Sequence, residues 1–255
     1  LTMTKLWSPI CERLGIENPI FGFAHDVEAV AAITNAGGYG VYGATRRFPH
    51  EIKEELAAIR KLVGDKAFGV DLVLPPGMPE HNSREAIEAE IPEEHKAFVE
   101  KLIDKFQVPT ATQPGMRTRF IRSTEIEEEQ IQAVLDSSVD MFACGIGAPA
   151  HVMKAAKARG KTTLALIGSP HHVKRAIDAG VEILVAQGYD AGAHTGPIGT
   201  YSLVPQIVDA AGDTPVLVAG GVATGRHIAA ALAMGAQGVW MGTAWLLSKE
   251  HQGHM

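Results

Sequence analysis

Long hydrophobic runs, basic blocks and cysteine motifs are all scarce in this sequence. No apolar run approaches the ~18 residues of a membrane-spanning helix, and no signal-peptide pattern opens the chain. The net charge of −6 is spread without a basic block, which argues against nucleic acid or an anionic membrane as a partner. The two cysteines, Cys11 and Cys144, form neither a disulfide framework nor a metal-binding spacing. We therefore expect a soluble, cytoplasmic protein.

What the sequence does contain is a regular alternation of short apolar runs and amphipathic stretches. With 255 residues, of which 46% are hydrophobic and 20% charged, the chain is long enough to bury a large core. The apolar runs are of the kind that forms strands buried on both faces. They predict strands over residues 19–23, 39–43, 66–74, 139–144, 162–167, 183–186, 215–219 and 238–242. The amphipathic stretches predict helices over residues 26–36, 49–62, 125–136, 149–158, 170–179, 201–211 and 225–234.

Eight strand-and-helix units within one domain's length favour a (β/α)8 TIM barrel over an open sheet. We therefore predict a single domain over residues 1–255. The polar, proline-punctuated segment 75–123 follows the third strand, has a helical patch at 93–106, and is expected to be a lid-like insertion. The eighth helix has barely begun when the sequence stops at Met255, so we expect the C-terminal end of the barrel to be truncated.

The stretch from Val181 to Thr200 has the pattern of a site. An apolar strand leads into a loop that carries several glycines and has His194 at its centre. Glycines allow a ligand to approach the backbone closely, and a histidine can exchange a proton near neutral pH. Three hypotheses stay open for His194: a catalytic base or anion binder, a metal ligand, and a loop residue bonded to backbone. Metal is disfavoured because no neighbouring histidine or carboxylate has ligand spacing.

Two glycine motifs follow the last two expected strands. They are Ala219-Gly-Gly-Val-Ala-Thr-Gly225 and Met241-Gly-Thr243. Barrels of this kind often bind phosphate through backbone amides of the loops after strands seven and eight. The motifs therefore predict an anion site at Gly220, Gly221, Gly242 and Thr243, although glycines also serve simply to turn tight corners.

Two polar residues end apolar strands and are candidates for orienting a ligand. Gln187 can both donate and accept hydrogen bonds, and Asp71 can accept one from a ring N–H group. Either residue could instead cap a helix. Cys144 has no activating histidine or lysine beside it in the sequence, so we expect it to be a small buried hydrophobe.

Taken together, these motifs resemble the nitronate monooxygenase family, formerly called 2-nitropropane dioxygenases. The resemblance runs in order along nearly the whole chain, through Asn18-Pro-Ile20, Asn35-Ala-Gly-Gly38, Phe68-Gly-Val70, Ala186-Gln-Gly188, Asp190-Ala-Gly-Ala-His-Thr-Gly196 and both glycine motifs. It implies non-covalently bound FMN, with the phosphate at the four residues of the anion site. It also implies Gln187 near the pyrimidine edge and His194 over the reactive face of the flavin. Gly22, Asp71, Gly188 and Gly192 complete the expected cofactor site.

The same resemblance implies oxidation of alkyl nitronates or nitroalkanes by O2 to a carbonyl compound and nitrite. His194 would hold the nitro group when protonated, or remove the α-proton when neutral. One alternative is an FMN-dependent NAD(P)H:quinone or enoyl-thioester reductase on the same barrel, and another is a phosphate-binding barrel without flavin. Asp71 is a departure, because an asparagine is common there, and a carboxylate would disfavour a reduced, anionic flavin. A homodimer is left open.

Overall fold

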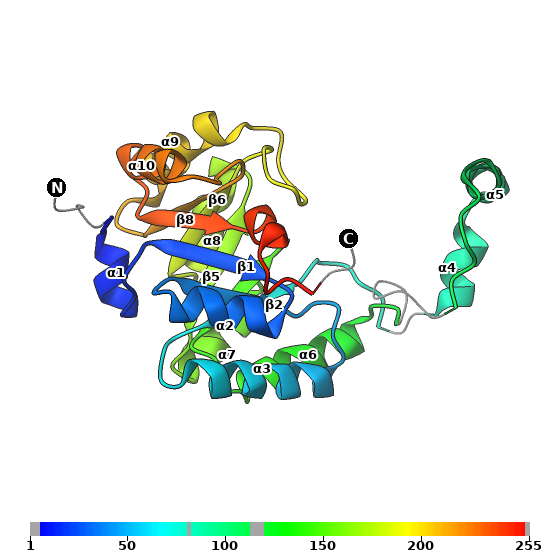
Figure 1. Ribbon diagram of the computed structural model, residues 1–255, viewed down its shortest axis with the longest axis horizontal. Coiled ribbons are helices and arrows are strands. Elements are labelled where there is room, and N and C mark those ends of the chain that lie inside the picture. Colours follow the sequence, from blue (N-terminus) through cyan, green and yellow to red (C-terminus); the bar gives the residue numbers. More distant parts are fainter. Residues whose placement is uncertain (1–5, 81–82, 113–119, 253–255) are drawn as a thin grey trace. The chain divides into compact units, whose positions relative to one another are not determined.

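Eight parallel strands close into a barrel in sequence order (Figure 1). The computed structural model of the chain describes residues 6–80, 83–112 and 120–252. Every strand pairs in parallel with the next, and pairing of Ile20 with Val239 closes the ring between the first and last strands. The strands are β1 (Ile20–Ala24), β2 (Tyr39–Gly43), β3 (Gly69–Val73), β4 (Met141–Gly145), β5 (Thr162–Ile167), β6 (Ile183–Gln187), β7 (Val216–Ala219) and β8 (Gly238–Met241). The predicted (β/α)8 barrel is confirmed.

Helices pack around the outside of this ring. Because residues alternate in direction along a strand, each strand contributes one set of side chains to an outer core beneath the helices and another to the barrel interior. Cys144 belongs to the outer core and is fully buried, as expected of a small hydrophobe. The helices are α2 (Val27–Asn35), α3 (Pro49–Val63), α6 (Thr124–Leu135), α7 (Ala150–Ala158), α8 (Val173–Asp178), α9 (Thr200–Ala211) and α10 (Gly225–Ala233), and a short 3-10 helix η1 (Pro170–His172) precedes α8.

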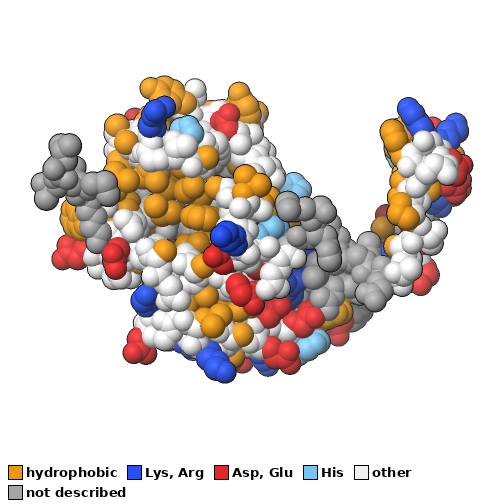
Figure 2. All heavy atoms as spheres, viewed as in Figure 1, with side chains coloured by type: hydrophobic (Ala, Val, Ile, Leu, Met, Phe, Trp, Pro, Cys, Tyr) orange, Lys and Arg blue, Asp and Glu red, His pale blue; other side chains and the backbone are white. Residues whose placement is uncertain are grey.

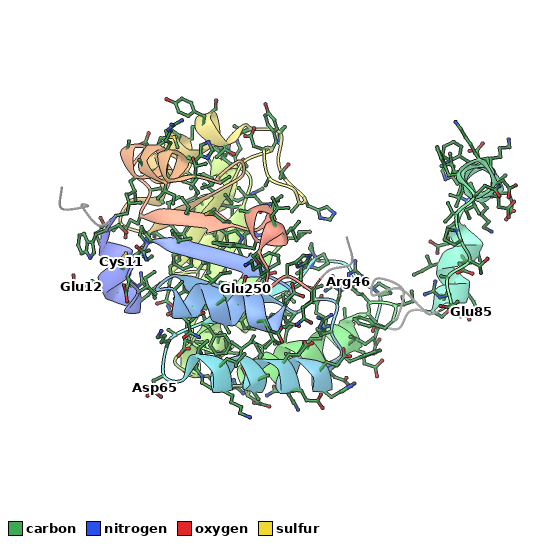
Figure 3. The ribbon with its side chains drawn as sticks, in the orientation of Figure 1. Cys11, Glu12, Arg46, Asp65, Glu85 and Glu250 are labelled. Carbon is green, nitrogen blue, oxygen red and sulfur yellow. The ribbon has the colours of Figure 1, made fainter. Side chains whose placement is uncertain are left out.

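The short helix α1 (Pro9–Leu14) closes the end of the barrel where the strands begin (Figure 3). Its Ile10 and Cys11 side chains are buried in the same cluster as the interior residues Phe21 and Met141. This helix has only six residues, and the sequence pattern does not predict it. The opposite end, where the strands finish, is called the mouth below.

The chain after β8 differs from the other units. Only the 3-10 helix η2 (Thr243–Leu247) follows, and no α-helix comes after β8 within the described residues. In Figure 1 no described α-helix lies in front of β8 and β1, and Figure 2 shows hydrophobic side chains gathered over this face. Beyond η2, His251 Nδ1 lies 2.6 Å from Asp26 Oδ2. Asp26 occupies the N-cap position of α2, as predicted, but its side chain contacts His251 and makes no capping bond.

The chain divides into two compact units. One is the barrel, residues 1–76 and 130–255, and the other is residues 77–129, which includes most of the expected insertion. The smaller unit holds α4 (Arg84–Glu90), α5 (Glu93–Phe106) and the start of α6. Ser83 caps α4 by accepting a hydrogen bond from the N–H of Ala86, and neither α4 nor α5 has a buried side chain. Within the described part of the chain, no helix has the length and apolar character needed to cross a bilayer.

Candidate functional site at the barrel mouth

The loops after β6, β7 and β8 meet at the mouth of the barrel. The N–H of Gly188 donates to the carbonyl of Ala219 at 3.1 Å, which ties the first loop to β7. A Cβ added at Gly220 would lie 3.1 Å from the Gly188 oxygen, and one added at Gly192 would lie 3.0 Å from Thr243 Oγ1. The structure therefore brings together four of the predicted cofactor residues, because the absence of side chains lets these backbones approach.

Backbone amides at this junction are available to a ligand. Gly220 and Gly221 have φ values of +107° and +71°, a conformation that glycine adopts without strain. No hydrogen bond within the described residues uses the N–H groups of Gly221, Gly242 and Thr243. Unpaired N–H groups on neighbouring loops favour an anion such as a phosphate.

Gln187 positions the backbone of the His194 loop. It ends β6, is 8% exposed, and donates from Nε2 to the carbonyl oxygen of His194 at 3.2 Å. The His194 side chain is exposed. Asp190 Oδ2 accepts from the N–H of Thr200 at 2.8 Å, and this bond holds the pKa of Asp190 below its usual range. Asp190 therefore caps the start of α9, whereas Gln187 lies within a strand and does not cap a helix.

Asp71 lies within β3 and is 5% exposed, so it does not cap a helix either. Gly69, two residues earlier and on the same face of the strand, abuts Val41 and Met141 of the interior core, which places Asp71 inside the barrel. Its Oδ2 atom has no hydrogen-bond partner among the described residues. Burial raises the pKa of this carboxyl to about 7. A buried polar atom without a partner is costly, so Asp71 is suited to receive an N–H group from a ligand.

Gly22 has a different environment from the other predicted cofactor residues. A Cβ at this position would lie 2.5 Å from Ile33 Cδ1 and 3.0 Å from Trp245 Nε1. Glycine is therefore required so that α2 and η2 can pack against β1. The structure gives Gly22 this packing role, and its contact with a cofactor stays a prediction.

Two features of the mouth are not assigned from the sequence. Phe23 stacks on Trp240 with ring centroids 5.8 Å apart and meets the ring of His25 edge-on at 4.9 Å. Ile146, which follows β4, is 43% exposed and has a φ of +49°, which is unusual for a β-branched residue. Such strain often accompanies ligand sites. The run Gly145-Ile-Gly147 at a strand end is the signal that could have drawn attention to it.

The backbone N–H groups and the buried carboxyl at this mouth suit a flat, anionic cofactor. Unpaired amides lie after β7 and β8, and a buried carboxyl without a partner lies inside the barrel wall. Among the described residues, no three His, Cys, Asp or Glu side chains gather in a way that could hold a metal ion. The residues present therefore fit a group with a phosphate at one end and a ring N–H at the other.

Known proteins share this sequence pattern and fold. The sequence profile of a family described as nitronate monooxygenase matches residues 8–255. A Mycobacterium tuberculosis protein named as a candidate monooxygenase is 39% identical over 94% of this chain and 66% of its own length. A Staphylococcus aureus protein named as a candidate nitronate monooxygenase is 30% identical over 94% of this chain and 68% of its own. The solved structure of nitroalkane oxidase from Streptomyces ansochromogenes is 25% identical, with a TM-score of 0.76 over 94% of this chain and 69% of that one. The chain thus spans about two thirds of the length of the curated relatives that it matches.

Proposed function

The chain belongs to the nitronate monooxygenase family, and on that premise we propose that it binds FMN and oxidises alkyl nitronates or nitroalkanes with O2. The products would be a carbonyl compound and nitrite. The relatives named for monooxygenase, nitronate monooxygenase and nitroalkane oxidase activity support this assignment. The observation that carries it is the pairing, at one mouth, of unpaired loop amides with the buried carboxyl of Asp71.

Each group at the mouth has a part in holding the cofactor. The amides of Gly221, Gly242 and Thr243 would bind the phosphate, and the positive φ of Gly220 turns the loop that presents Gly221. Asp71 and Gln187 would meet the polar edge of the ring. Gly188 and Gly192 let the loops pack closely around the proposed site, because a Cβ there would lie 2.2 Å from Thr200 Oγ1 or 3.0 Å from Thr243 Oγ1. When bound, FMN supplies the electron transfer, and the protein supplies placement and electrostatics.

His194 is the residue we assign to the substrate. Gln187 fixes its carbonyl at 3.2 Å while its imidazole stays exposed at the mouth, so the ring can meet a small molecule that enters from solvent. A protonated imidazole would attract the negative nitronate group, and a neutral one would remove the α-proton of a nitroalkane. The two forms act on different substrates, so both a nitronate and a nitroalkane should be tested.

The experiment begins with an absorption spectrum of the purified protein reconstituted with FMN. It continues with nitrite release from a nitronate under air by the wild-type chain, by His194→Ala, and by His95→Ala as a control. His95 is an exposed histidine on α5, outside the barrel unit. We expect His194→Ala to retain FMN and lose turnover by 100-fold or more, within the ~10²–10⁴-fold range of general acid–base catalysis, and His95→Ala to behave as wild type.

Two results would overturn the proposal. Undiminished turnover by His194→Ala would remove this residue from the mechanism. Prompt anaerobic bleaching of the flavin by NADH, without nitrite release from any nitronate, would replace the proposed monooxygenase with a reductase on the same barrel.

A further inference from the structure

The carboxyl of Asp71 is unusual in having no interaction that stabilises a charge. Among the described residues, only Asp71 and Ser248 carry a fully buried side-chain oxygen without a hydrogen-bond partner. In register, Asp71 stands between Gly43 of β2 and Ala143 of β4, and a Cβ at Gly145 would lie 3.9 Å from its Oδ2. Its neighbours in register therefore have small or no side chains and give the carboxyl no donor, and the rings of Phe23 and His25 fill the space that a Gly43 side chain would take.

Within the described barrel, no charged group faces Asp71 from the elements packed against it. On its inner face, β2 presents Tyr39, Val41 and Gly43, and β4 presents Met141, Ala143 and Gly145. Tyr39 is neutral at ordinary pH, since burial raises its pKa well above the usual value. His25, at the mouth, places Nδ1 2.9 Å from the Gly43 carbonyl oxygen. Burial is the only cause that acts on the pKa of Asp71, so neither His25 nor any described cation offsets its charge.

A neutral carboxylic acid and an ionised carboxylate offer a ligand different groups. The neutral acid has one O–H donor and one carbonyl acceptor, whereas the carboxylate only accepts. The imide edge of a flavin has an N–H between two carbonyl oxygens, so a neutral acid can pair with it in both directions. A carboxylate would instead face one of those carbonyl oxygens with a second negative oxygen, in a site that a bound ring closes to water.

We propose that Asp71 couples flavin uptake to a proton: its side chain binds the imide edge of the ring as a neutral carboxylic acid, and the complex weakens when that acid ionises. This inference rests on the FMN site of the proposed function and deepens it. A flavin ring that binds only the protonated form of Asp71 keeps the proton on this carboxyl. Its dissociation constant therefore rises tenfold for each pH unit above the titration point of the free site.

The test is a fluorescence titration of flavin-free protein at several values between pH 6 and pH 9. Riboflavin is the first probe because it lacks the phosphate, whose own charge changes near pH 6, and FMN is the second. For the wild type we expect the dissociation constant to be on the order of 100-fold larger at pH 9 than at pH 6. Asp71→Asn keeps an acceptor and a donor without an ionisable proton, so its constant should stay flat.

The ratio of wild-type to Asp71→Asn constants cancels any titration that belongs to the ligand. Asp190→Asn is the matched control, because Asp190 is a carboxylate at the mouth whose pKa is lowered, and it should keep the wild-type slope. If Asp71→Asn does not fold, the riboflavin series on the wild type carries the test alone.

Three outcomes would count against the inference. A ratio that does not change with pH would overturn it and leave the FMN site standing. Wild-type affinity that rises with pH would also overturn it, because the carboxylate would then be the binding form. Absence of binding by either protein, with either probe at any pH, would remove the FMN site itself.

Discussion

Replacing Asp71 with asparagine should stabilise the flavin-free protein, and the gain should depend on pH. The carboxyl is 5% exposed, and burial raises its pKa from 3.8 to about 7. One pKa unit corresponds to about 1.36 kcal/mol. Raising the pKa from 3.8 to about 7 therefore means that folding with the carboxyl charged costs roughly 4 kcal/mol more than folding with it neutral. Asparagine has a similar shape and carries no charge, and it avoids most of this penalty.

The sign follows from proton binding. Between pH 3.8 and about 7 the folded protein holds a proton on Asp71 that the unfolded chain has lost. The free energy of unfolding of the wild type therefore falls as pH rises through this window, and the contribution levels off above the folded pKa. Asp71→Asn lacks this dependence. Its advantage over the wild type should grow by about 3 kcal/mol between pH 5 and pH 8.

Urea unfolding followed by circular dichroism at pH 5 and pH 8 measures this difference. Other ionisable groups shift both proteins alike, so the change in the gap reports Asp71 alone. Asp209→Asn, at an exposed aspartate on α9, is the control and should leave the gap near zero at both pH values. A gap between Asp71→Asn and wild type that is equal at pH 5 and pH 8 would refute the reasoning, because it would mean that the buried carboxyl ionises as freely as in the unfolded chain.

Two further predictions concern stability and access. Gly220→Ala should destabilise the protein by about 2–3 kcal/mol, because its φ of +107° does not suit alanine and the new Cβ would lie 2.5 Å from Thr200 Oγ1. Gly221→Ala should cost only about 1 kcal/mol. The urea midpoints of the two variants measure the difference, and equal losses of stability would contradict the geometry. The buried thiols of Cys11 and Cys144 should react with a thiol reagent only through opening of the structure, with Cys11 first because it lies on a six-residue helix at one end of the barrel. Peptide mapping after brief labelling decides this, and labelling of Cys144 as fast as Cys11 would count against it.

The barrel can be predicted because its strands are short apolar runs in the sequence, separated by glycine or polar residues. Boundaries depend on interactions that the pattern does not contain. The pattern starts the third strand at residue 66, but the strand begins at Gly69, because the N–H of Phe68 donates to the side chain of Asp140 (Oδ2, 3.1 Å) and not to the backbone of a neighbouring strand. Helix α1 is not predicted because its six residues are too short to show a helical pattern, and Ile10 and Cys11 are buried only by the end of the barrel.

The site shows where sequence pattern stops being informative. Along β3, Val70 and Leu72 alternate with Asp71, so the pattern alone places the carboxyl on the opposite face from those two residues. In a parallel barrel both faces of a strand are buried, and the pattern cannot say which face is the interior. The register with Gly43 and Ala143 decides it. The carboxyl has no partner because its neighbours in the barrel have small or no side chains. Those neighbours belong to strands that are far apart in the sequence. The role proposed for Asp71, a protonated acid that pairs with a ring N–H group, therefore follows from the assembled barrel and could not be predicted from a local motif.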